Sequence, residues 1–327
     1  MRLARLFPAL FALTVIAIPA FSQVNVPQEN DNLQLPVDQV EDSDTRTNVL
    51  GAYVSERGVL DLRNVQSDDF SGLAGLDDVR DLLLDGSSIT DLSPLARMKG
   101  VEMISMSGTD VVDLSPLAGL TSLRHLYLNG TPVTDLTPLS KMTWLEDIGA
   151  DDTLIEDLSP LKRLTKLRRL SIQGTLVSDL GPLQNHKNIN WLNLADSLVT
   201  DISVLRQFEV MHELSLGGTM IEDISPLSEL FVMKILRLDG TFVHDIKPLQ
   251  NLDLLVELNL GLTAVADISP LATMDNLRFL DLSATAVEDV SPLSNLDKLR
   301  EVRLQGAAVT DYSPLADLAQ RGLKIGQ

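Results

Sequence analysis

The stretch GTPVTDLTPLS, residues 130–140, is repeated along the chain with small changes. Close copies read GTDVVDLSPLA at 108–118, GTLVSDLGPLQ at 174–184, GTMIEDISPLS at 218–228 and GTFVHDIKPLQ at 240–250. The aspartate in the middle recurs every 22 residues without a slip, at Asp69, Asp91, Asp113, Asp135, Asp157, Asp179, Asp201, Asp223, Asp245, Asp267, Asp289 and Asp311. A fixed period of this length indicates a solenoid, so the sequence predicts a stack of similar coils.

Each copy has the same pattern around its aspartate. Apolar residues stand nine and seven places before it, as in Leu126 and Leu128, and their neighbours are polar, which predicts a short strand with one buried face. Two places before the aspartate, Val133 turns inward again. After the aspartate, apolar residues come at every third place, as in Leu117 and Leu120, which predicts a short helical or 3-10 return segment.

The run LRHLYLNGTPVTDLTPL, residues 123–139, combines L-x-x-L-x-L with V-x-D-L-x-P-L. This pattern resembles the leucine-rich-repeat family in its 22-residue, internalin-like bacterial variety. The resemblance implies an α/β solenoid: a right-handed curved superhelix with a concave parallel sheet and short helical or 3-10 segments on the convex side. The family usually has asparagine in the turn after the strand. This chain instead has a threonine able to bond to neighbouring backbone, at Thr109, Thr131, Thr175, Thr219, Thr241, Thr263 and Thr285.

The chain divides into five segments by composition. Residues 1–22 combine Arg2 and Arg5 with an apolar stretch and small residues before Gln23, which predicts a cleaved signal peptide; a membrane anchor is the alternative. Residues 23–47 are expected to be a flexible acidic leader, and 48–58 an N-terminal cap. Twelve 22-residue units fill 59–315, and 316–327 are expected to form a C-terminal cap. We therefore expect an exported protein, periplasmic or extracellular, with no membrane span after cleavage.

The repeated aspartate precedes a serine or threonine and then a proline, which together favour the start of a helix. Serine is a good N-cap and proline suits the first helical position, so the carboxylate is expected to bond to free backbone N–H groups there. A calcium ladder is the alternative, but calcium requires several oxygens from one loop, and each repeat offers one aspartate beside Leu and Pro. The structural role is therefore preferred.

Composition narrows the classes of partner and of chemistry. The formal charge is −20, which argues against nucleic acid and anionic membranes and favours a protein partner with a basic patch. The absence of cysteine excludes disulfides, a thiol nucleophile and thiolate metal sites. The four histidines show no metal-ligand spacing, so we expect no metal and no cofactor. A triad of His125, Asp147 and Ser171 is conceivable, but an open sheet offers it little shelter from water.

Strand residues ten, eight and six places before each aspartate are expected to face solvent on the concave side. These positions vary between repeats, as a recognition surface would, and they include large aromatic and apolar groups typical of protein interfaces. The candidate partner-binding residues are Met103, His125, Tyr127, Asp147, Asp151, Arg169, Ser171, Trp191, Asn193, Ile235 and Phe279. The alternative is an inert surface with scattered apolar groups.

The repeats between residues 144 and 204 depart most from the pattern. Ala150 and His186 fill core positions that usually hold leucine, Asp152 and Asp196 replace the turn glycine, and Val204 replaces the proline. Function and drift both explain such changes. The sequence thus predicts a monomeric, non-enzymatic module that binds a protein on its concave face. An enzyme or enzyme regulator acting on a cell-envelope polymer is the alternative, and a structural spacer is a third hypothesis.

Overall fold

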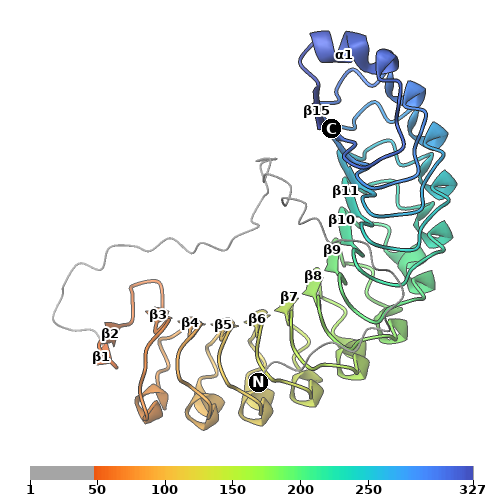
Figure 1. The fold of residues 1–327 in the computed structure, drawn as a ribbon. Coiled ribbons are helices and arrows are strands. Elements are labelled where there is room, and N and C mark those ends of the chain that lie inside the picture. Colours follow the sequence, from red (N-terminus) through yellow and green to blue (C-terminus); the bar gives the residue numbers. More distant parts are fainter. Residues whose placement is uncertain (1–47, 327) are drawn as a thin grey trace, which may run out of the picture. The chain divides into compact units, whose positions relative to one another are not determined.

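The computed structural model describes residues 48–326. The expected signal peptide, 1–22, and acidic leader, 23–47, lie outside the described residues. The described part is built around one sheet of 13 parallel strands, in which each strand pairs with the next one in the chain. Figure 1 shows this sheet along the inner side of a curve and short helices along its outer side, as the resemblance implies.

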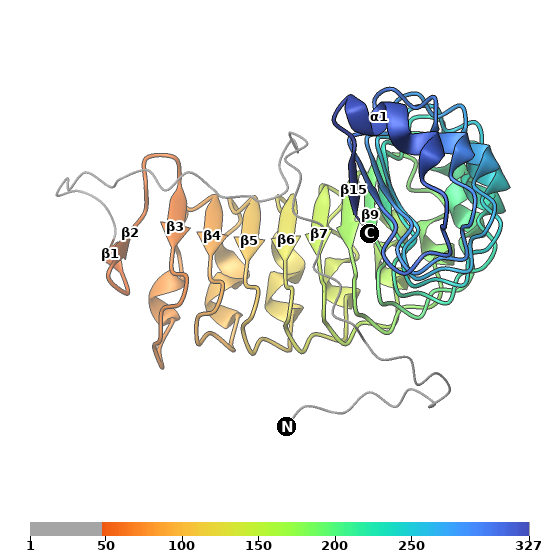
Figure 2. The same cartoon turned by 45° about the horizontal axis from the view of Figure 1, so that its top comes forward.

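The strands are three residues long and lie in one register. The pair Leu126 and Ile148 illustrates it, since residues 22 apart face each other across neighbouring strands (Figure 2). The strands are β3 (Val59–Asp61), β4 (Asp81–Leu83), β5 (Met103–Ser105), β6 (His125–Tyr127), β7 (Asp147–Gly149), β8 (Arg169–Ser171), β9 (Trp191–Asn193), β10 (Glu213–Ser215), β11 (Ile235–Arg237), β12 (Glu257–Asn259), β13 (Phe279–Asp281), β14 (Glu301–Arg303) and β15 (Lys324–Gly326).

Short 3-10 helices return the chain from one strand to the next. They are η1 (Ser71–Leu73), η2 (Ser93–Arg97), η3 (Ser115–Gly119), η4 (Thr137–Leu139), η5 (Ser159–Arg163), η6 (Gly181–Leu183), η7 (Ser203–Gln207), η8 (Ser225–Leu227), η9 (Lys247–Leu249), η10 (Ser269–Leu271), η11 (Ser291–Leu293) and η12 (Ser313–Leu315). The predicted alternation of strand, turn and 3-10 return is confirmed in every repeat.

The core lies between the sheet and the 3-10 helices. In one repeat, Leu126, Leu128, Val133, Leu136 and Leu139 are all buried, and the equivalent residues of the next repeat lie beside them. Burial of one such side chain is worth about 1.5–3 kcal/mol relative to exposure. Because every coil contributes the same set, the core is a continuous aliphatic stack, and the predicted pattern of inward residues is confirmed.

All twelve ladder aspartates make the same hydrogen bond. The Oδ1 of each accepts the backbone N–H two residues later, at 2.7–2.8 Å, as Asp201 does from Ser203. The capping role is confirmed, but the detail differs from the prediction. In η2, Ser93 is the first helical residue and Pro94 the second, so the serine is not the N-cap. Leu92 takes the N-cap position of η2 and points into the core, so the capping oxygen comes from Asp91, one residue earlier.

The turn threonines take the place of the family's asparagine. Each of the seven hydroxyls is buried and donates to the carbonyl oxygen three residues earlier, at 2.6–2.7 Å. Thr153 and Ser197 make the same bond in the irregular repeats. The hydroxyl therefore gives this buried carbonyl oxygen a short hydrogen bond from within the turn.

The irregular residues keep the fold of the coil. Asp152 and Asp196 adopt φ values of 54° and 55°, the left-handed conformation that glycine holds in other repeats. Asp and Asn tolerate this region better than most side chains. Ala150 and His186 are buried in the core positions predicted for them. The Nε2 of His186 lies 3.1 Å from the carbonyl oxygen of Leu161, and burial lowers the pKa of this imidazole.

Two further elements lie at the ends of the described chain. Before the first repeat, β1 (Asn48–Val49) and β2 (Ala52–Tyr53) form an antiparallel pair. After the last repeat, α1 (Ala316–Gln320) leads to β15, which pairs with β14 and lengthens the sheet by one strand. Among residues 48–326, we find no helix with the length and apolar character needed to cross a membrane.

Candidate binding surface on the concave face

The concave surface is formed by the first and third residues of each strand. The central residue, such as Leu126 in β6, points into the core, so its two neighbours point away from it. Because neighbouring strands lie about 4.8 Å apart, equivalent side chains form rows that run along the solenoid. Any pair of residues 22 apart in these rows is close enough to interact.

Seven of the eleven predicted residues are partly exposed. Six of them lie in these rows, and Asp151 lies in the turn after β7. The seven are His125, Tyr127, Asp147, Asp151, Arg169, Trp191 and Asn193. The prediction of exposure is wrong for the other four, which are buried: Met103, Ser171, Ile235 and Phe279. The reason is crowding, because on a curved inner face long side chains of adjacent strands lie over one another. Among the predicted residues, the partly exposed ones lie on β6–β9 and in the turn after β7, while β3, β10, β12 and β14 also carry partly exposed residues at these strand positions.

His125 and Asp147 form a pair at the first strand position. The Nδ1 of His125 lies 2.9 Å from Oδ2 of Asp147 on the next strand. This hydrogen bond is the main reason that the pKa of His125 lies above its ordinary value, although burial acts against it. Protonation of His125 thus strengthens the pair.

Tyr127 lies over the next strand at a glycine. A Cβ on Gly149 would come within 3.0 Å of the Tyr127 ring and 3.1 Å of the Asn129 side-chain oxygen. Glycine therefore leaves room for the ring to lie against the sheet. Burial, reinforced by the Asp147 charge, raises the pKa of Tyr127 to about 12, so the phenol stays protonated and can donate a hydrogen bond.

Arg169 and Trp191 stack across β8 and β9. The guanidinium carbon lies 5.0 Å from the centroid of the indole ring, within the range of a cation–π contact. The indole Nε1 of Trp191 is buried and has no hydrogen-bond partner among the described residues. An unpaired buried donor costs roughly 1–3 kcal/mol, so this tryptophan is not optimised for the fold alone.

Asp151 is held by its own strand neighbours. Its Oδ1 accepts the Ser171 hydroxyl at 2.5 Å and the Gln173 backbone N–H at 2.8 Å. Burial is the main cause that raises the pKa of Asp151 above its ordinary value. Since Ser171 donates to Asp151 and His125 bonds to Asp147, the structure does not assemble the conceivable Ser–His–Asp relay.

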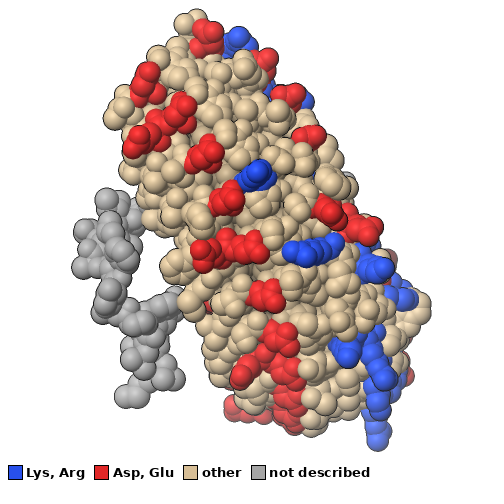
Figure 3. All heavy atoms as spheres, turned by 90° about the vertical axis from the view of Figure 1, so that its right-hand side faces the viewer, with Lys and Arg blue, Asp and Glu red and all other residues tan. Residues whose placement is uncertain are grey.

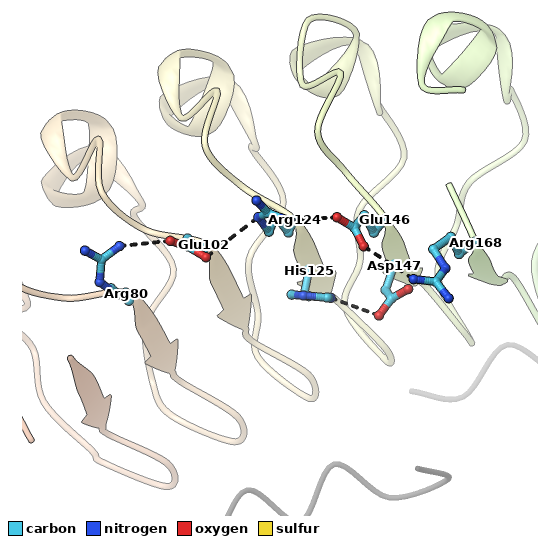
Figure 4. Close-up of polar contacts among 7 residues, drawn as sticks. All are labelled: Arg80, Glu102, Arg124, His125, Glu146, Asp147 and Arg168. Atoms are coloured by element: carbon cyan, nitrogen blue, oxygen red, sulfur yellow. Dashed lines mark hydrogen bonds and ion pairs between the residues drawn. The ribbon is translucent and has the colours of Figure 1, made fainter. Parts of the chain in front are cut away.

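A ladder of alternating charges borders this surface, and the sequence analysis missed it. The residues immediately before the strands pair across successive repeats, and Figure 4 shows them as one line. The distances are 2.8 Å for Arg80–Glu102, 3.7 Å for Glu102–Arg124, 2.9 Å for Arg124–Glu146 and 4.0 Å for Glu146–Arg168. The signal was present, because arginine and glutamate alternate at the position eleven residues before the aspartate.

A second ion cluster occupies the sheet beyond β9. Arg237 contacts Glu213 at 2.6 Å and Glu257 at 3.1 Å, so one guanidinium links three strands. All three residues lie in the rows that the sequence predicts to be on the concave face. The sequence analysis did not predict that these opposite charges would pair. The charges of this cluster pair with one another. The partly exposed aromatic side chains of the predicted set lie instead at β6–β9.

Three solved structures show the same architecture. The internalin InlF of Listeria monocytogenes has a TM-score of 0.77 and 26% sequence identity, over 83% of this chain and 86% of that one. The chain is an internalin-like leucine-rich-repeat protein. A leucine-rich-repeat protein of Leptospira interrogans has a TM-score of 0.66 and 15% identity, over 79% of this chain and 74% of its own. The plant peptide hormone receptor RGFR1 has a TM-score of 0.61 and 13% identity, over 72% and 41%.

No protein-family model matches the internalin-like chain, and no curated protein matches it in sequence. Its similarity to other proteins therefore lies in the repeat architecture. Within residues 48–326, no three His, Asp or Glu side chains gather in an arrangement suited to a metal ion. In the aspartate ladder, one oxygen of each carboxylate faces a backbone N–H, which is the structural role described above.

Proposed function

We propose that this protein is an exported module, periplasmic or extracellular, that binds a protein partner with a basic patch through the concave face at β6–β9. The contact residues are His125, Tyr127, Asp147, Arg169, Trp191 and Asn193. The observation that carries the proposal is the Arg169–Trp191 stack, with its buried and unpaired indole N–H. Tryptophan, tyrosine and arginine supply most of the binding energy in protein interfaces, and here they lie on adjacent strands.

The wider fold supports the same reading. The plant receptor RGFR1, which shares the architecture, was solved in complex with RGF2. A curved sheet presents side chains from many repeats to one ligand, so each repeat varies its surface without changing its core. The partner itself is expected to be basic because Asp147 and Asp151 lie in this region and the whole chain carries a charge of −20.

The experiment compares partner capture by three forms of the protein from an envelope extract of the source organism. The wild type and Trp144→Ala should recover the same partner, because Trp144 is an exposed tryptophan in the turn before β7 and does not belong to the proposed surface. The double variant Tyr127→Ala/Trp191→Ala should recover at least tenfold less, as expected for loss of two aromatic anchors. Equal recovery by all three forms would contradict the proposal.

A further inference from the structure

A row of apolar side chains stands exposed on the flank where the chain leaves the strands. It occupies the position three residues before the ladder aspartate, in five consecutive repeats, and its side chains are 45–61% exposed. We call this row the exit stripe; its residues are Leu154, Leu176, Leu198, Met220 and Phe242. Exposed apolar side chains scattered singly are normal, whereas a contiguous row is typical of an interaction site.

Backbone hydrogen bonds between successive coils support the exit stripe, and Ala264 and Ala286 make the same bond in the repeats that follow it. The N–H of Leu176 donates to the carbonyl of Ile155 in the preceding repeat at 3.0 Å, and Leu198 donates to Val177 at 3.0 Å. The acceptor residues are buried, so each turn alternates one inward and one outward apolar side chain. Since coils are spaced as the strands are, about 4.8 Å apart, the outward side chains lie side by side.

The apolar character is confined to these five repeats. At the same position, the repeats on either side carry small or polar residues: Gln66, Ser88, Asp110, Pro132, Ala264, Ala286 and Ala308. A residue that the coil needs for its fold would recur in all repeats, as the ladder aspartate does. The stripe is therefore a local feature of the surface rather than part of the repeat framework.

The turns that carry the exit stripe are acidic, although the Arg206 guanidinium in η7 interacts with Asp201 and Asp223. The five turns 152–157, 174–179, 196–201, 218–223 and 240–245 contain no Lys or Arg. They contain nine carboxylates, which are Asp152, Glu156, Asp157, Asp179, Asp196, Asp201, Glu222, Asp223 and Asp245. The one histidine in these turns, His244, lies 3.8 Å from Glu222. This acidic rim disfavours an anionic lipid surface and favours a basic protein segment.

The opposite flank, where the chain enters the strands, carries cations next to carboxylates such as Glu102 and Glu146. There, Lys166 and Arg124 approach the ring of Trp144, at 2.9 and 5.5 Å from its centroid. Figure 3 shows most Lys and Arg along one side of the face it draws, with Asp and Glu among them, and a row of Asp and Glu without such cations along the other side. The net charge of −20 thus hides two flanks of different character.

We propose that the exit stripe binds an amphipathic α-helix of a protein partner, with one row of apolar side chains on the stripe and Lys or Arg on both sides facing the acidic rim. The spacing supports a helix, because its turns repeat every 5.4 Å and the stripe repeats about every 4.8 Å. Five repeats match roughly four helical turns. The site lies on a different face from the concave surface and does not depend on the proposed function.

The test uses two synthetic 18-residue helical peptides with the same leucine face, one with lysine and one with glutamate at all other positions. Binding to the full chain is measured by fluorescence anisotropy. The Leu/Lys peptide should bind the wild type, and Leu198→Ser/Met220→Ser/Phe242→Ser should weaken this binding at least tenfold. Phe231→Ser, which removes an equally exposed side chain from the opposite flank, should leave it unchanged. The Leu/Glu peptide should bind neither form.

Three results would overturn the proposal. Equal binding of the Leu/Lys peptide to the wild type and the triple variant would mean that general charge attraction explains it. Equal binding of both peptides to the wild type would remove the role of the acidic rim. Concentration-dependent self-association of the wild type that the triple variant lacks would assign the stripe to a second copy of the chain. Unchanged circular dichroism of the triple variant establishes that it is folded, and normal peptide binding by Tyr127→Ala/Trp191→Ala separates this site from the concave face.

Discussion

At the scale of single residues, the turn threonines show how one hydroxyl replaces a longer side chain. Thr219 is buried and donates to the carbonyl of Leu216 at 2.6 Å, while its own backbone N–H reaches the same oxygen at 3.3 Å. The turn therefore relies on two donors for one acceptor. Threonine here replaces the asparagine that is usual in the family. Both side chains place a short polar group next to buried backbone.

The contribution of this hydroxyl is measurable. Thr219→Val keeps the shape of the side chain and removes the hydrogen bond, so the free energy of unfolding should fall by about 1 kcal/mol. Thr200→Val, at an exposed position of the preceding repeat, is the matched control and should change it little. Urea titrations of both variants check the prediction, and equal stabilities would show that the hydroxyl is dispensable.

Residue scale is also where prediction from sequence succeeded least. Met103, Ile235 and Phe279 stand at positions that alternation assigns to solvent, yet they are buried. Alternation fixes the side of the sheet on which a residue lies, but its exposure depends on how far neighbouring side chains reach across a curved face. By contrast, the stack of Arg169 and Trp191 was within reach, because the two residues are 22 apart on adjacent strands.

At the scale of the element, the first backbone N–H of each 3-10 helix donates to an aspartate carboxylate of the preceding turn. For Asp201, the backbone N–H of Ser203 and then its side chain hold the pKa of the carboxyl below its ordinary value of 3.8. The same direction holds for Asp69, Asp91, Asp113, Asp157, Asp223, Asp267 and Asp311. The carboxylate thus binds the N–H groups best when it is ionised.

The sign of the pH dependence follows from this shift. A folded pKa below the unfolded one stabilises the fold above the unfolded pKa, and this stabilisation is lost as pH falls through the folded pKa. Asp201→Ala should therefore lower the melting temperature at pH 7, and the gap to the wild type should narrow below about pH 3.5. Asp201→Asn, which keeps an Oδ1 acceptor, should lie between the two at pH 7. A gap that is constant from pH 7 to pH 3 would argue against an ionised cap.

The elements were the most predictable level of the structure. The 22-residue period predicts the strand, the turn and the 3-10 return segment in each copy. The structure adds which residue begins each 3-10 helix. The end of the sheet was harder to predict. Segment 324–326 lacks the aspartate phrase that identifies a repeat, and its pairing with β14 depends on α1 returning the chain to the sheet edge.

At the scale of the whole molecule, each coil contacts its neighbours in sequence, so the two ends of the sheet are its exposed edges. At one end, β15 pairs along β14, with Val302 opposite Ile325. Unpaired strand edges promote association between chains. By pairing with β14, β15 satisfies the strand edge of the twelfth repeat.

Removal of β15 should therefore have a visible effect. A chain that ends after Arg321 loses the buried Leu323 and leaves the polar backbone of β14 unpaired. We expect a lower melting temperature and concentration-dependent growth in particle size by light scattering. Lys324→Ala, which keeps the backbone of β15, is the control and should behave as the wild type. A truncated chain that stays monodisperse would show that the edge needs no cover.

The strict 22-residue register also has an evolutionary consequence. Because every junction between coils uses the same hydrogen bonds and the same inward side chains, a duplication or loss of one unit by unequal recombination would create a junction that the fold already contains. The protein can thus gain or lose reach in single steps while the concave surface and the exit stripe keep their residues. The number of repeats can therefore change without altering the residues exposed on the repeats that remain.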